Sequence, residues 1–163
     1  MSATLDVNIL VYAADQTSSH HGRARALLEH VAASSAITYL FWPVLLGYMR
    51  IVTHAAIVEA PLSPEAALAD IDDLIRRPQI VVPGEGDRFW EGFKGVAGAV
   101  QPRGTLVPDA HLVALMHEHG VAEIWSNDRD FRKFDGITPL NPFDVKYSTG
   151  FGSRHSPVSP AVL

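Results

Sequence analysis

The sequence lacks cysteine altogether, which excludes disulfide bonds and thiolate–metal sites. It also lacks an uninterrupted apolar run of about 18 residues, the length that a membrane-spanning helix needs. No basic stretch followed by an apolar one stands at its start, so no export signal is expected. We therefore expect one compact domain in the cytoplasm, and 163 residues, of which 47% are hydrophobic, suffice for a single core.

Positive charge is scarce as well. Lysine and arginine number 13, against 18 aspartate and glutamate residues, so the net charge is −5. The chain has no bulk positive field that attracts nucleic acid, and a polyanion must be held locally. Arg129, Arg132 and Lys133 are candidates for such local contacts, and the alternative for each is an ordinary solvated surface cation.

Several familiar site motifs are also missing. The sequence contains no phosphate-binding loop, no dinucleotide-binding glycine motif and no nucleophile elbow. Of its eight histidines, His117 and His119 are two residues apart on an expected helix and point to roughly opposite sides. We therefore do not expect a zinc site. His111 is two residues from Asp109, so it is expected either near the site or, as we favour, in a structural role.

Strand-like and helix-like segments alternate along the chain, which predicts an α/β fold with a sheet covered by helices on both faces. The expected strands are Ala3–Val7, Ala36–Leu40, Ile80–Val82, Val121–Ser126 and Ile137–Leu140. The expected helices begin at Asn8, His20, Trp42, Pro64, Asp87 and Asp109, and a short helical turn follows Asp128. The pattern ends near residue 143, so we expect one domain over residues 1–143 and a Gly/Ser/Pro-rich extension over 144–163.

The expected helix Trp42–Val52 is apolar around most of its circumference. One stripe contains Trp42, Leu45, Leu46, Met49 and Val52, and a second contains Val44, Tyr48 and Ile51. A helix of this kind needs covering on more than one side. The second stripe is expected either to receive a partner or to be buried within the monomer.

Three aspartates are expected at matched ends of these elements. Asp6 stands in the first strand, where an unpaired carboxylate would be costly to bury. Asp128 follows a later strand, and Asp109 begins the helix that leads into that strand. Ligands of parallel sheets bind at the carboxyl ends of the strands. Oxygen ligands select a hard ion, Mg²⁺ or Mn²⁺, so we expect a metal site, with a helix cap for Asp109 and a turn for Asp128 and Asp130 as alternatives.

Four segments carry a family resemblance: "LDVNILVYA", "WPVLLGYMRIVTH", "LVPDAHLVALMHEHG" and "IWSNDRDFRKFDGI". In this order and near this spacing, they resemble the PIN-domain ribonucleases and, among them, the VapC toxins of type II toxin–antitoxin pairs. The resemblance covers residues 1–143. It implies a Rossmann-like three-layer sandwich with about five mostly parallel strands, Mg²⁺-dependent endoribonuclease activity, homodimers and a VapB antitoxin as partner.

The resemblance also implies roles for individual residues. Asp6, Asp109 and Asp128 would bind the metal ion, with Asp130 assisting them. Asn8 and Ser126 would not bind the ion themselves but would orient these carboxylates or a bound water. Arg50, Arg129, Arg132 and Lys133 would contact RNA phosphates. The metal would lower the pKa of a bound water and polarise the phosphate, and the products would carry a 5′-phosphate and a 3′-hydroxyl.

One position departs from the family pattern. Much of the family has a glutamate three residues before the arginine of the second segment, and Gly47 stands there, before Arg50. This puts a second metal ion in doubt. It also leaves open a catalytically degenerate module that binds RNA or a partner without cutting. A phosphotransferase with Asp6 as nucleophile is the third alternative, but "VNIL" after Asp6 does not match the phosphatase pattern.

Overall fold

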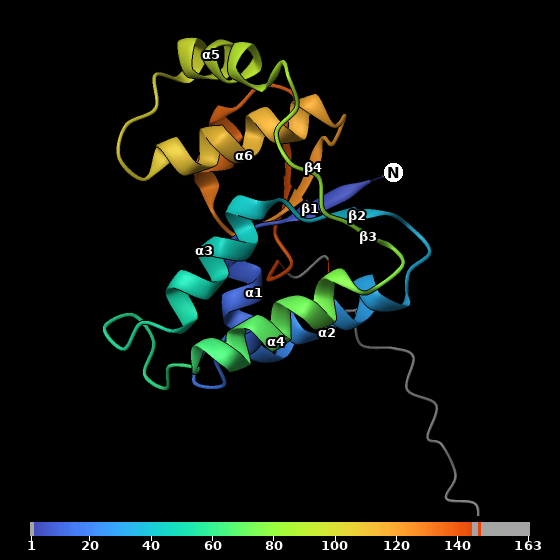
Figure 1. Ribbon diagram of the computed structural model, residues 1–163, viewed down its shortest axis with the longest axis vertical. Helices are drawn as coiled ribbons and strands as arrows, with labels where there is room; N and C mark the ends of the chain where they lie inside the picture. Colours follow the sequence, from blue (N-terminus) through green and yellow to red (C-terminus); the bar gives the residue numbers. More distant parts are fainter. Residues whose placement is uncertain (1, 145–146, 148–163) are drawn as a thin grey trace, which may run out of the picture.

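The computed structural model describes residues 2–144 and 147, and its centre is a five-stranded sheet (Figure 1). The strands are β1 (Ala3–Leu5), β2 (Thr38–Tyr39), β3 (Ile80–Val81), β4 (Glu123–Trp125) and β5 (Thr138–Leu140). They lie in the order β3-β2-β1-β4-β5, and every pair is parallel. The expected strands are therefore all present, and the sheet is parallel throughout.

Strand β1 lies where the strand order reverses. Its Thr4 is in register with Tyr39 of β2 on one side and with Ile124 of β4 on the other. Leu5 is in register with Trp125, so β1 and β4 end side by side. The Asp6 amide donates a hydrogen bond to the Trp125 carbonyl at 3.0 Å. This reversal creates the crevice in which open α/β sheets bind their ligands.

Six α-helices surround the sheet: α1 (Val7–Ala14), α2 (His21–Ala33), α3 (Trp42–Val52), α4 (Pro64–Ile75), α5 (Phe89–Val100) and α6 (Leu106–Glu118). Figure 1 shows α5 and α6 on one side of the sheet and α2 and α4 on the other, which confirms the three-layer arrangement. A short 3₁₀ helix, η1 (Arg129–Lys133), follows β4. None of the helices in residues 2–144 is long and apolar enough to span a membrane.

One hydrophobic core joins the layers. Fully buried apolar side chains come from both faces of the sheet and from the helices that cover it: Leu5, Ile9, Leu27, Leu45, Leu115 and Ile124. Helix α6 contributes an almost continuous buried run from Leu112 to Met116. On the opposite side of the sheet, α4 begins as expected at Pro64, and the hydroxyl of Ser63 caps it by accepting a hydrogen bond from the Ala66 amide at 3.1 Å.

Several element boundaries differ from the expectation by a few residues, and two of the differences involve predicted site residues. Strand β1 ends at Leu5 and α1 begins at Val7, so Asp6 lies at the junction and not inside a strand. Helix α6 begins at Leu106, so Asp109 lies within its first turn and the expectation of a helix cap is wrong. Proline fits the first turn of a helix without losing an intrahelical hydrogen bond, which lets the "LVP" segment be helical.

Helix α3 is covered mainly from within the monomer. Its Val44 and Tyr48 are buried, and the Tyr48 hydroxyl donates to the Asp70 carboxylate at 2.5 Å. Val44 and Tyr48 of the second stripe are therefore buried within the monomer, while contact of this stripe with a partner stays a prediction because Tyr48 also lines a groove. Trp42 and Leu46, one turn apart, are the large apolar side chains that α3 leaves exposed, at 42% and 59%.

Candidate active site

Asp6 is held at the junction of β1 and α1 with only 4% of its surface exposed. Its Oδ2 accepts hydrogen bonds from the Ser126 hydroxyl at 2.6 Å and from the Asn8 side-chain amide at 3.2 Å. Burial raises the pKa of Asp6, the Ser126 hydrogen bond opposes this, and the Asp128 charge raises it further. The structure thus supplies partners for the carboxylate whose burial first required an explanation.

Ser126 joins two of the predicted aspartates. This residue follows β4 and is 1% exposed. Its hydroxyl donates to Asp6 and accepts a hydrogen bond from the Asp128 amide at 2.9 Å. A hydroxyl provides one donor and two acceptor positions, so a single oxygen fixes the Asp6 side chain relative to the loop that carries Asp128.

Asp128 has a structural role in addition to its place at the site. It stands at the N-cap of η1, and its Oδ1 accepts a hydrogen bond from the Asp130 amide at 2.8 Å. The turn expected as an alternative for Asp128 is therefore present. The same turn directs the Asp128 carboxylate toward Asp6 and Asp109, with both of which it interacts electrostatically.

Asp109 completes the group from the first turn of α6. Its pKa is raised to about 7, first by burial and then by the negative charges of Asp6, Asp128 and Asp130. A raised pKa of this kind is typical of carboxylates that share a site. Asp6, Asp109 and Asp128 therefore lie close enough to interact electrostatically, from the ends of β1 and β4 and from the start of α6.

Lys133 is a cation that lies beside these carboxylates. Its ammonium lies 2.8 Å from Asp130 Oδ1, and its charge lowers the pKa of Asp109. Arg129 and Arg132 are exposed on the same 3₁₀ helix, whereas Arg50 is exposed on the last turn of α3. The predicted RNA-contacting residues therefore fall into two places, with three of them beside the aspartates.

The donor chemistry of the site suits a hard divalent ion. Carboxylate oxygens from Asp6, Asp109 and Asp128, with the Asn8 amide beside them, are ligands that Mg²⁺ and Mn²⁺ accept. Across residues 2–144 and 147, however, no three acidic or histidine side chains stand close enough to hold an ion directly. The oxygen ligands suit a divalent ion, and the mutual repulsion of the carboxylates would be relieved by one. The ligand set itself stays a prediction.

Gly47 lies where α3 passes close to α1. A Cβ atom built on Gly47 would meet the Val7 Cγ2 atom at 3.4 Å, an ordinary contact distance. Val7 follows Asp6 directly, so Gly47 is near the carboxylates. A side chain at this position is therefore sterically possible, so crowding does not explain why a glycine stands where much of the family has a glutamate.

Sequence reasoning missed a group of side chains beside Asn127. The Asn127 side-chain amide lies 3.4 Å from the Tyr12 hydroxyl, and the Tyr12 ring contacts His20 and Phe143. One signal was available, because Tyr12 is four residues after Asn8 and so lies on the same face of α1. The contact of Phe143 with α1 has no signal in the local sequence pattern.

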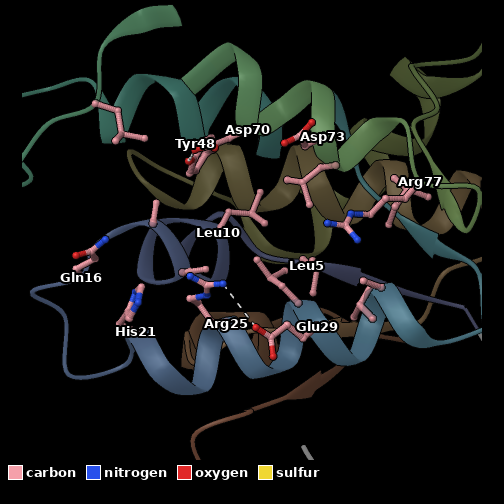
Figure 2. Close-up of a pocket in the computed structure, with 18 residues that line it drawn as sticks. Leu5, Leu10, Gln16, His21, Arg25, Glu29, Tyr48, Asp70, Asp73 and Arg77 are labelled. Atoms are coloured by element: carbon pink, nitrogen blue, oxygen red, sulfur yellow. Dashed lines mark hydrogen bonds and ion pairs between the residues drawn. The ribbon is translucent and has the colours of Figure 1, made fainter. Parts of the chain in front are cut away.

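A groove of about 440 Å³ lies between α2 and α4. Figure 2 shows Arg25 and Glu29 reaching toward it from α2, with Asp73 and Arg77 on the α4 side. Leu10 of α1 forms part of its apolar lining. None of the four clustered aspartates lines this groove, so the groove is separate from the carboxylates.

Comparison with known proteins places this fold and site in a family. A model of the PIN domain matches residues 3–137. The chain is 51% identical to Ribonuclease VapC48 of Mycobacterium tuberculosis, covering 88% of this chain and 99% of that protein. It is 34% identical to Ribonuclease VapC43 of the same species, covering 86% and 95% of the two chains.

Solved structures show the same fold at low sequence identity. VapBC2 of Rickettsia felis, bound to a DNA fragment from its promoter, aligns with a TM-score of 0.64 and 15% identity, over 86% of this chain and 98% of that chain. VapC20 of Mycobacterium tuberculosis, a toxin that cleaves the sarcin–ricin loop, aligns with a TM-score of 0.60 and 15% identity, over 80% and 92%. The match to the family model and the high identity to curated relatives show that this chain belongs to the PIN domain family and, within it, to the VapC proteins.

Proposed function

We propose that this protein is the toxin of a type II toxin–antitoxin pair, a metal-dependent endoribonuclease neutralised by a VapB antitoxin in the cytoplasm. The observation that carries the proposal is the convergence of Asp6, Asp109 and Asp128, in which one Ser126 hydroxyl links two of the three. The 51% identity to a protein named as a ribonuclease, over almost its whole length, supports the same activity.

The proposal gives each residue of the site a task. Asp6, Asp109 and Asp128 hold Mg²⁺ or Mn²⁺, assisted by Asp130, while Asn8 and Ser126 keep the Asp6 carboxylate in place. When bound, the ion polarises the scissile phosphate and lowers the pKa of its water. Lys133, Arg129, Arg132 and Arg50 contact the RNA backbone, because these cations lie on η1 beside the carboxylates or on α3.

The activity is tested by incubating the purified chain with total RNA and Mg²⁺ and mapping the new ends. Cleavage with 5′-phosphate ends that is lost in Asp6→Asn supports the proposal. The matched control is Asp87→Asn, an exposed aspartate in the loop before α5, which should cleave like the wild type. If the wild-type chain instead binds RNA and leaves it intact, the protein is the catalytically degenerate module suggested by Gly47.

The antitoxin is proposed to occupy the groove between α2 and α4 (Figure 2). Its apolar lining includes Leu28 and Leu74, and cations and carboxylates alternate at its rim, a combination that suits an amphipathic segment of a partner. Leu74→Arg should abolish co-purification with a VapB protein encoded beside this gene. Leu68→Arg, at a residue of α4 that is 52% exposed and outside the groove, is the control that should leave binding unchanged.

The proposal includes a homodimer, as the family resemblance implies. Trp42 and Leu46 form an exposed apolar pair on α3, which is the part of this helix available to a second subunit. Light scattering should give twice the monomer mass for the wild type. Leu46→Glu should shift the mass to that of a monomer if this pair belongs to the interface.

A further inference from the structure

Three aromatic rings lie together at one side of the proposed active site. Phe143, which follows β5, stacks on His20 with ring centres 4.1 Å apart, and its edge meets Tyr12 at 5.7 Å. The Tyr12 and His20 rings are 4.9 Å apart. All three residues are partly exposed. We call Tyr12, His20 and Phe143 the aromatic cluster.

The aromatic cluster is connected to the carboxylates by a short path of side chains. Tyr12 is one helical turn from Asn8, whose amide donates to Asp6. On the other side, the Tyr12 hydroxyl lies 3.4 Å from the side-chain amide of Asn127, and Asn127 directly precedes Asp128. Because one helical turn advances about 5.4 Å, the cluster lies close enough for a nucleotide adjoining the cleaved phosphate to reach it.

The side chains around the aromatic cluster are those that recognise unpaired bases. Aromatic rings stack on bases, and amide side chains such as that of Asn127 form hydrogen bonds with base edges. The Arg23 guanidinium donates to the Phe143 carbonyl, and it carries further N–H donors that suit a sugar or phosphate oxygen. The same cluster also packs the segment after β5 against α1 and α2, so a test must separate recognition from folding.

The charge of the molecule favours recognition by stacking. The net charge is −5, and four aspartates are gathered at the proposed active site, so RNA gains little from long-range attraction. Stacking on an uncharged ring does not depend on neutralising phosphate, and its contribution is less sensitive to salt. We propose that the aromatic cluster, with Asn127 and Arg23, binds one unpaired base of the RNA next to the cleaved phosphate; this inference rests on the proposed ribonuclease function.

The experiment combines a protein change with the removal of one base from the substrate. The cleaved sequence is first selected from a pool of random single-stranded RNA. It is then synthesised with an abasic nucleotide at each position flanking the cut. In the wild type, loss of one particular base should lower kcat/KM by about 5-fold to 100-fold, the range expected for a lost base stack. In Phe143→Leu and Tyr12→Leu, the intact and abasic substrates should be cleaved at similar rates.

Two further variants serve as controls. Tyr12→Phe keeps the ring and should keep most of the abasic effect. Trp90→Leu removes an aromatic residue that is 61% exposed on α5 and stacks on Phe93, and it should leave the abasic effect unchanged. If Phe143→Leu instead slows intact and abasic substrates by the same factor, the cluster serves the fold alone and the proposal is wrong.

A binding measurement separates this proposal from the proposed activity. The Asp6→Asn chain is titrated with the same fluorescently labelled oligonucleotides, intact and abasic, with and without Phe143→Leu. An abasic penalty that disappears with Phe143→Leu supports the base site even if no preparation cuts RNA. Cleavage without any base-dependent penalty at a flanking position would support the nuclease and overturn the base site.

Discussion

The carboxylate site and the groove between α2 and α4 lie on either side of β1, and they use charge in opposite ways. At the site, side chains of one sign are brought together and fixed by a buried serine. In the groove, Arg25, Glu29, Asp73 and Arg77 alternate in sign around an apolar lining. The first arrangement is unfavourable until a cation enters, whereas in the second Arg25 and Glu29 already form an ion pair.

This difference shows how one small sheet can separate chemistry from recognition. Like charges held together store unfavourable energy that an ion relieves, which makes the site selective for cations. Mixed charges around apolar side chains are instead complementary to an amphipathic surface. Mutations in the two regions should therefore affect different measurements, and each of the following predictions tests that separation.

The largest effect is expected for Asp128→Asn. Loss of one carboxylate weakens the proposed ion site and should lower kcat/KM for RNA by about 1000-fold or more, in line with the several kcal/mol that a metal ion contributes to such a reaction. Binding of the VapB partner, measured by calorimetry, should stay within about threefold of the wild type, since threefold is below 1 kcal/mol. A parallel loss of both would show that the two regions are not separate.

Ser126→Ala should have the next largest effect. It removes the hydrogen bond to Asp6 and the acceptor for the Asp128 amide, and loss of such a supporting residue typically costs about 10-fold to 100-fold in activity or metal affinity. The free energy of unfolding should also fall by about 1–3 kcal/mol, because polar groups are left buried without partners. Ser126→Thr keeps the hydroxyl and is the matched control; wild-type activity in the alanine variant would contradict the linking role.

Asp109→Asn should stabilise the metal-free protein at alkaline pH. The folded-state pKa of Asp109, about 7, lies above its ordinary value of 3.8, so between these pH values the folded chain binds a proton that the unfolded chain has released. The free energy of unfolding of the wild type should therefore fall as the pH rises from about 4 to about 7. Above pH 7, Asp109→Asn should be more stable than the wild type by about 2 kcal/mol, a value reduced to allow for the half-exposed position.

Urea denaturation in chelator, at pH values from 4 to 8, measures this difference. Below pH 4 the wild type and the variant should have nearly equal stability, since Asp109 is then protonated in both states. Asp87→Asn is again the control, and its curve should run parallel to that of the wild type. An Asp109→Asn curve parallel to that of the wild type throughout would show that the charge of Asp109 does not destabilise the folded state.

Tyr48→Phe should have the smallest effect. It removes the hydrogen bond to Asp70 between α3 and α4, and such a loss typically lowers the free energy of unfolding by about 1 kcal/mol. RNA cleavage should not change, because Tyr48 lines the groove and not the carboxylate site. Thermal unfolding and a cleavage assay on one preparation check both expectations; reduced cleavage with unchanged stability would contradict them.

Much of the fold could be predicted from local pattern, because hydrophobic periodicity and turn chemistry act over short distances. All five strands and the start of α4 at Pro64 were predicted in this way. The predicted end of β1 and the predicted start of α6 were wrong, and these two boundaries decide where Asp6 and Asp109 lie in their elements. A strand of three residues gives too short an alternating pattern to show where it stops.

The site could be predicted only in part. The group of three aspartates followed from where parallel strands end, a rule that needs no atomic detail. The bridging geometry of Ser126, the raised pKa of Asp109 and the contact of Phe143 with α1 depend on side chains distant in sequence. Likewise, both stripes of α3 are apolar, so their pattern could not show that Trp42 and Leu46 stay exposed.

The Ser126 hydroxyl has a consequence for the synthesis of the protein. Its hydrogen bond joins Ser126 to Asp6, 120 positions earlier in the chain. Strand β1 leaves the ribosome long before its neighbour β4. Domains fold as units once their chain is available, so a nascent chain that ends before Ser126 carries Asp6 with only Asn8 as its side-chain partner. The carboxylates of the proposed site are therefore brought together only after most of the domain has been synthesised.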